Sequence, residues 1–145
     1  MIRGIGLDIL REIETMLNEN GADLYRGEAV TQTEHALQCA ALAEAQKASH
    51  YLVTATLLHD IGHLLEPDFA NSDKHDKDLH HEDLGEAFLE RWSDDPVVEP
   101  VKLHVAATRY LCAKNEGYFP KLSPDSFRSL QLQGGKMSEQ EVKGF

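Results

Sequence analysis

The stretch "LLHDIGHLL", residues 57–65, places two histidines and an aspartate within a run of leucine and isoleucine. Residues 49–65 are apolar on nearly every side, which predicts a helix at the centre of the fold. A buried carboxylate or imidazole without a partner is costly, and a metal ion would compensate both groups. His59 and His63 share a helix face because they are four residues apart, and Asp60 lies beside them. Hydrogen bonding within the core is the alternative explanation for each residue taken alone.

Histidines in other segments extend this cluster. His35 lies in the preceding predicted helix, His81 begins the following one, and His104 lies midway along the next. A helical bundle directs side chains from several helices into one core, so these residues can form a dimetal centre. Imidazole and carboxylate ligands suit iron, zinc or manganese. Asp60 is assigned as the bridge because a carboxylate has two oxygens. His80 competes with His81 as a ligand, and spacing does not separate the two neighbours.

Helix signals cover most of the chain and indicate an all-α fold. Thr31 and Glu34 form a capping-box pattern before one apolar segment, and Ser138 with Glu141 repeats it near the end. No alternating strand pattern and no repeat interrupts these segments, so we expect a single domain over residues 1–145. The predicted helices are 2–18, 31–47, 49–65, 81–92 and 96–113, with a short helix after Ser123-Pro124.

Composition excludes several classes of function. The formal net charge of −11 argues against nucleic acid as a partner, because phosphates would be repelled. No apolar run approaches the roughly 20 residues of a membrane span. Cys39 and Cys112 lie in apolar helical contexts, which favours buried thiols in a reducing cytoplasm. Composition carries no signal for the oligomeric state.

Five segments in order resemble a known family. The pair His59-Asp60 with His35 resembles the HD-domain superfamily of metal-dependent phosphohydrolases. The wider set resembles, more narrowly, the HD-type di-iron oxygenases of phosphonate catabolism, which use a mixed-valence Fe(II)/Fe(III) pair and O2 to cleave a carbon–phosphorus bond. The resemblance covers about residues 28–144, and its segments are "GEAVTQTEHALQCAALAE", "LLHDIGHLL", "HEDLGEAFLERW", "EPVKLHVAATRYLCA" and "LSPDSFRSLQLQGG".

The resemblance assigns a role to each matching residue. It implies an HD-domain helical bundle in which His35 and His59 bind one iron, His81 and His104 bind the other, and Asp60 bridges the two. It gives three further residues catalytic roles. His63 moves or positions a proton, Tyr25 caps the second iron before substrate arrives, and Glu28 meets the substrate's amino group.

The resemblance also implies how a phosphonate is held. Ser126, Ser129 and Gln133 recur at spacings of three and four, so they share one face of a helix whose N-terminus attracts anions. The family has a lysine where this chain has Thr108, which removes a charge from the phosphonate site and leaves the substrate's R group open. The expected reaction converts a small 1-hydroxy(amino)alkylphosphonate and O2 into a carboxylic acid, such as glycine, and phosphate.

Two expectations qualify this interpretation. The family's final aspartate ligand lies beyond Phe145, so we expect the chain to lack the C-terminal portion of the HD domain. The alternative function is a metal-dependent phosphohydrolase acting on a phosphate ester or nucleotide, with manganese or zinc in place of iron and a metal-activated water as nucleophile.

Overall fold

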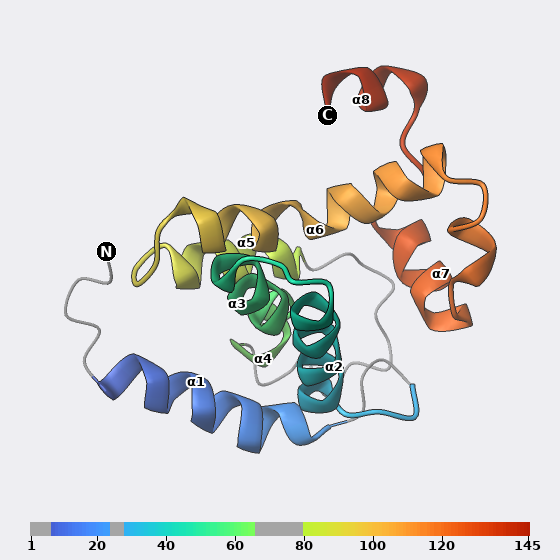
Figure 1. Ribbon diagram of the computed structural model, residues 1–145. Helices are drawn as coiled ribbons and strands as arrows, with labels where there is room; N and C mark the ends of the chain where they lie inside the picture. Colours follow the sequence, from blue (N-terminus) through green and yellow to red (C-terminus); the bar gives the residue numbers. More distant parts are fainter. Residues whose placement is uncertain (1–6, 24–27, 66–79) are drawn as a thin grey trace. The chain divides into compact units, whose positions relative to one another are not determined.

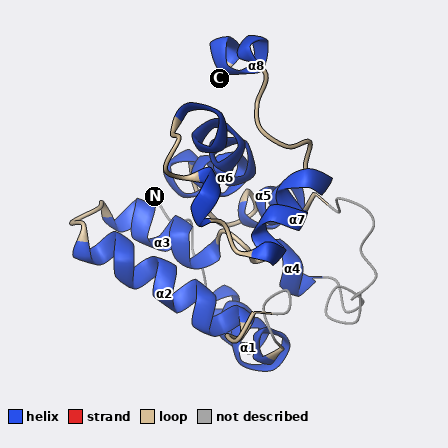
Figure 2. Cartoon of the chain, turned by 90° about the vertical axis from the view of Figure 1, so that its right-hand side faces the viewer, coloured by secondary structure: helices blue, strands red, loops and turns tan. Residues whose placement is uncertain are grey.

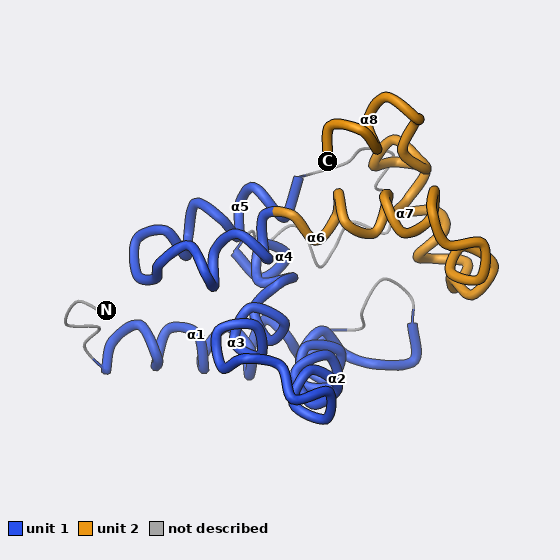
Figure 3. Tube along the Cα trace, turned by 45° about the horizontal axis from the view of Figure 1, so that its top comes forward, with its two compact units in different colours: residues 1–73, 80–102 blue, residues 74–79, 103–145 orange. Residues whose placement is uncertain are grey.

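The computed structural model describes residues 7–23, 28–65 and 80–145, and these ranges contain helices and no strand (Figure 2). The all-α prediction is therefore confirmed. The chain divides into two compact units, and the boundary falls within helix α6 (Figure 3). Among the described residues, the first unit comprises 7–23, 28–65 and 80–102, and the second comprises 103–145.

The first unit is built from α1 to α5 and the beginning of α6 (Figure 1). Helix α2 packs along α3, α4 packs on α5, and α1 contacts both α2 and α4. Their apolar side chains form one core around Ile61 and Val101, which are almost fully buried. The bounds are α1 Leu7–Glu19, η1 Asn20–Ala22, α2 Gln32–Ala45, α3 His50–Leu58, α4 Gly62–Leu65, α5 His81–Leu89 and α6 Asp95–Lys114.

The second unit contains the rest of α6, then η2 Phe119–Lys121, α7 Pro124–Leu132 and α8 Glu139–Gly144. Leu130 and Cys112 are buried here. Arg109 connects α6 to the following segments, because its Nε donates to the Gly135 carbonyl at 2.8 Å and its Nη2 to Glu141 at 2.8 Å. The guanidinium of Arg109 therefore holds α8, together with the segment around Gly135, to α6.

Local capping explains where the helices begin. Thr31 Oγ1 accepts from the Glu34 N–H while the Glu34 carboxylate accepts from the Thr31 N–H, so the predicted capping box is present. Ser138 and Glu141 form the same arrangement before α8. Ser123 caps α7 through the N–H of Ser126, as its position before proline predicts.

The prediction of one continuous helix over 49–65 is wrong. Helix α3 ends at Leu58, and α4 begins at Gly62. Between them the N–H of Ile61 donates to Leu58 and the N–H of His63 donates to Asp60, which is the tighter i to i+3 pattern. Periodicity alone cannot reveal this change, because the flanking residues are apolar on both sides of it.

Within the described ranges, no helix combines the length and apolar character needed to cross a bilayer.

Candidate metal centre

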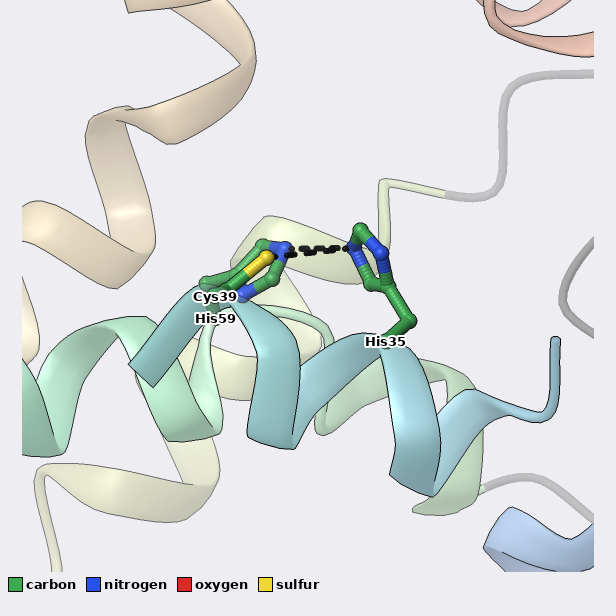
Figure 4. A group of neighbouring side chains, drawn as sticks. All are labelled: His35, Cys39 and His59. Carbon is green, nitrogen blue, oxygen red and sulfur yellow. Dashed lines mark hydrogen bonds between the residues drawn. The ribbon is translucent and has the colours of Figure 1, made fainter. Parts of the chain in front are cut away.

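The carboxylate of Asp60 lies between two groups of imidazoles. Its Oδ2 is 3.1 Å from Nε2 of His59 and 3.3 Å from Nε2 of His35. The two imidazole Nε2 atoms are themselves 3.3 Å apart (Figure 4). Helix α2 supplies His35, whereas His59 and Asp60 come from the turn after α3. Three donors from two segments therefore converge on one point.

The other oxygen of Asp60 faces a second pair of histidines. Oδ1 is 3.0 Å from Nε2 of His81 and 3.9 Å from Nε2 of His63. The rings of His63 and His81 are stacked with centroids 4.0 Å apart. Asp60 and His81 are both buried. Each carboxylate oxygen thus has its own imidazole group, which is the arrangement that a bridging carboxylate requires.

Groups around these histidines orient their rings. His59 Nδ1 is 2.7 Å from the Thr56 carbonyl, so Nδ1 donates there and Nε2 is directed at Asp60. Glu82 Oε2 is 3.5 Å from Nδ1 of His81 and lies on the opposite side of that ring from Asp60. Glu82 is buried. Such outer carbonyl and carboxylate partners commonly fix metal-ligating imidazoles.

The electrostatics of the cluster favour positive charge at its centre. Burial lowers the pKa of His35, but hydrogen bonds to Asp60 and Cys39 and their charges outweigh burial and raise it to about 10. Burial also lowers the pKa of His59, while the charge of Asp60 and its hydrogen bond raise it to about 9. The raised pKa values favour the protonated imidazoles in the metal-free chain, and a divalent cation would compete with those protons.

The donor set fits a metal ion. The described residues include a group, His35, Cys39 and His59, whose donor atoms all lie within 4.8 Å of one another. Imidazole nitrogens and carboxylate oxygens of this kind suit iron, zinc and manganese, whose selection depends on geometry and availability. The presence of candidate metal-binding residues agrees with the sequence interpretation, while the identity of the metal stays a prediction.

The remaining predicted ligands and catalytic residues are placed as follows. His104 is half-buried on α6 in the second unit. His80 has 63% of its side chain exposed, so the histidine beside Asp60 is His81. Glu28 is half-buried before α2. Tyr25 lies outside the described residues.

The predicted phosphonate residues belong to the second unit. Ser126 and Ser129 are half-buried on α7, and Gln133 caps its C-terminal end. The hydroxyls of Ser123 and Ser126 are 3.0 Å apart. Thr108 Oγ1 donates to the His104 carbonyl at 3.0 Å, so its proton serves its own helix.

Sequence reasoning missed two residues near the histidines. Cys39, expected to be a buried thiol, is half-buried with Sγ 3.7 Å from His35 Nε2. Its position four residues after His35 on a helix was the signal that could have indicated this contact. Glu82 received no role, although it follows His81 directly. Cys112 is buried, as expected.

A helical fold with a His-Asp pair among converging histidines defines a class of metal-binding protein. The family model described as HD domain matches residues 33–121. The chain therefore belongs to the HD-domain family.

Three relatives are similar to this chain over most of its length. Hydroxymethylphosphonate dioxygenase of Gimesia maris is 43% identical over 137 residues, which cover 90% of this chain and 65% of the relative. A [1-hydroxy-2-(trimethylamino)ethyl]phosphonate dioxygenase (glycine-betaine-forming) of Leisingera caerulea is 39% identical over 95% of this chain and 70% of its own length. Uncharacterized protein L432 of Acanthamoeba polyphaga mimivirus is 33% identical over 94% of this chain and 65% of its own length. The chain thus spans about two thirds of the length of each relative.

Proposed function

We propose that this chain is an O2-dependent di-iron oxygenase that cleaves the carbon–phosphorus bond of a small 1-hydroxyalkylphosphonate. The proposal rests on the two oxygens of the Asp60 carboxylate, which face different histidines. Oδ2 lies beside His35 and His59, and Oδ1 lies beside His81. Two neighbouring cation positions follow from that arrangement. Two relatives are named phosphonate dioxygenases, and they supply the reaction class.

The proposed metal centre has two neighbouring positions, each for one metal ion. In this proposal His35, His59 and Asp60 would hold the first metal, and Asp60, His81 and His104 would hold the second. When bound, an iron pair would supply the binding position for O2 and pass to it the electrons that the substrate gives up. The protein's part is to orient the imidazoles, and the Thr56 carbonyl does this for His59 by accepting from Nδ1, which directs Nε2 at Asp60.

The products follow from the balance of atoms. One O2 and one 1-hydroxyalkylphosphonate give one carboxylic acid and one phosphate, with one oxygen atom added to carbon and the other to phosphorus. His63 lies 3.9 Å from Asp60 and stacks on His81, which supports a proposed role in holding or moving a proton beside the second metal. Tyr25 and Glu28 complete the proposed catalytic set as a cap and an amine contact.

Substrate binding is assigned to Ser126, Ser129, Gln133 and Thr108. The N-terminus of α7 offers backbone N–H groups and a favourable dipole to an anion. Thr108 brings no charge, and its hydroxyl proton is directed at a helix carbonyl. A lysine at this position would add a cation, so we propose that phosphonate affinity in this chain depends more on the serines of α7.

The proposed partners are O2 and a small hydroxyphosphonate substrate. The cytoplasmic location, which cysteine usage indicates, stays a prediction.

The test of the proposed function is anaerobic loading with Fe(II), followed by limited O2 and a panel of phosphonates. The panel contains hydroxymethylphosphonate and [1-hydroxy-2-(trimethylamino)ethyl]phosphonate, the compounds in the relatives' names. We expect one O2 consumed for each phosphate released.

Two variants control that experiment. His59→Ala removes a proposed ligand and should abolish turnover. His50→Ala removes an exposed imidazole from α3 and should leave turnover unchanged. Phosphate released from esters without O2 uptake would instead identify a phosphohydrolase and reject the oxygenase.

A further inference from the structure

Cys39 contacts the first group of imidazoles from the same helix as His35. The two residues are four apart on α2, so their side chains lie on one face (Figure 4). Cys39 Sγ is 3.7 Å from His35 Nε2, and it lies within 4.8 Å of the donor atom of His59. The thiol is thus a neighbour of two proposed metal ligands.

The separations of these donors match those around a single small cation. A tetrahedral ion with nitrogen at about 2.0–2.1 Å and sulfur at about 2.3 Å places neighbouring donors about 3.3–3.6 Å apart. The observed separations are 3.3 Å between His35 and His59, 3.3 Å and 3.1 Å from these to Asp60, and 3.7 Å from His35 to Cys39. Cys39 Sγ therefore lies at about the separation from His35 Nε2 that two ligands of one ion would have.

We propose that Cys39 is a thiolate ligand of the metal held by His35, His59 and Asp60. The inference rests on the metal centre of the proposed function and extends it by one donor of a different chemical type. A soft thiolate favours a borderline cation such as Fe(II), Co(II) or Zn(II) over Mg(II). The first position would then differ in ligand chemistry from the second, which has imidazole and carboxylate donors alone.

Cobalt(II) provides a direct probe, because a Co–thiolate bond gives a charge-transfer absorption that nitrogen and oxygen ligands do not give. The chain is titrated anaerobically with Co(II), and bound metal is counted. We expect two cobalt ions per chain with the thiolate absorption. In Cys39→Ser the absorption should be lost, and affinity at the first position should fall by at least about tenfold, the lower end for outer metal partners.

Cys112→Ser is the matched control, because Cys112 is buried in the second unit. It should keep both the absorption and the affinity. A second readout uses the unaltered chain: bound metal should protect Cys39 from alkylation by iodoacetamide, as followed by mass spectrometry of the peptide. This readout holds even where a Cys39 variant fails to fold.

The outcomes separate this inference from the proposed function. Two bound cobalt ions without thiolate absorption, or absorption that persists in Cys39→Ser, would reject Cys39 as a ligand and leave the dimetal centre standing. Absence of any bound cobalt would reject both proposals. Thiolate absorption in a chain that shows no O2-coupled phosphate release when loaded with iron would support the ligand and reject the oxygenase.

Discussion

Gly62 packs directly against the backbone of His81. A Cβ atom at position 62 would overlap the His81 carbonyl oxygen and would lie 2.8 Å from its carbonyl carbon. Only glycine therefore allows α4 to approach α5 this closely. Since His81 Nε2 lies 3.0 Å from Asp60, this approach also sets the spacing across the candidate metal centre.

Gly62→Ala should push α5 away from α4. We expect a loss of about 1–3 kcal/mol in the free energy of unfolding, the usual cost of overpacking, together with weaker binding of the second metal. Urea denaturation and metal counting measure the two effects. Gly144→Ala is the control, since a Cβ there meets nothing within 4 Å. Equal stability of the two variants would contradict the proposed role of Gly62.

Asp60→Asn should remove the bridge between the two metal positions. The amide keeps one oxygen acceptor but loses the negative charge and the second equivalent oxygen. We expect two divalent ions per chain in the unaltered protein and at most one in the variant, as measured by elemental analysis after anaerobic loading. His50→Ala should bind two. Retention of both ions by Asp60→Asn would remove Asp60 from the ligand set.

Stability of the metal-free chain should fall as pH rises. His35 and His59 have a pKa raised from 6.5 to about 10 and about 9, so their protonated forms are favoured by folding. That contribution is complete below about pH 6.5 and is lost as pH rises through 9 to 10. Urea midpoints between pH 6.5 and 10 should decrease. A midpoint that stays level or increases would contradict this assignment.

Metal loading should reverse that trend. Bound metal requires neutral imidazoles, so protons compete with it, and binding strengthens as pH rises. The gap in urea midpoint between loaded and metal-free chains should therefore widen from pH 6.5 to 9.

Asp60→Asn should flatten the pH dependence of the urea midpoint in the metal-free chain, because Asp60 supplies the attraction that holds the protons on both histidines.

Arg109→Lys should loosen α8 without changing the net charge. The lysine keeps a cation but lacks the planar fork that reaches both Gly135 and Glu141. We expect loss of the Gly135 bond to cost about 1 kcal/mol locally, with faster hydrogen exchange over residues 138–145. Exchange in α2 should be unchanged. Equal protection of α8 in both proteins would show that Arg109 does not hold it.

The sequence by itself determined the all-α class and the capped helix starts, and it indicated a metal-binding site. Capping boxes at Thr31 and Ser138 depend on hydrogen bonds between residues three apart, so they can be recognised without a fold. The His59-Asp60 pair in an apolar segment indicated a metal centre for a similar local reason, since buried polar groups need compensation. These inferences required no knowledge of distant neighbours.

Only the tertiary structure decided which side chains meet. It breaks the expected helix between Leu58 and Gly62, places His81 rather than His80 beside Asp60, and brings Cys39 to the imidazoles. The position of His81 beside Asp60 depends on a close approach of segments far apart in the chain, with Gly62 packed against the backbone of His81. Periodicity describes one helix at a time, whereas the position of a donor atom depends on the packing of several.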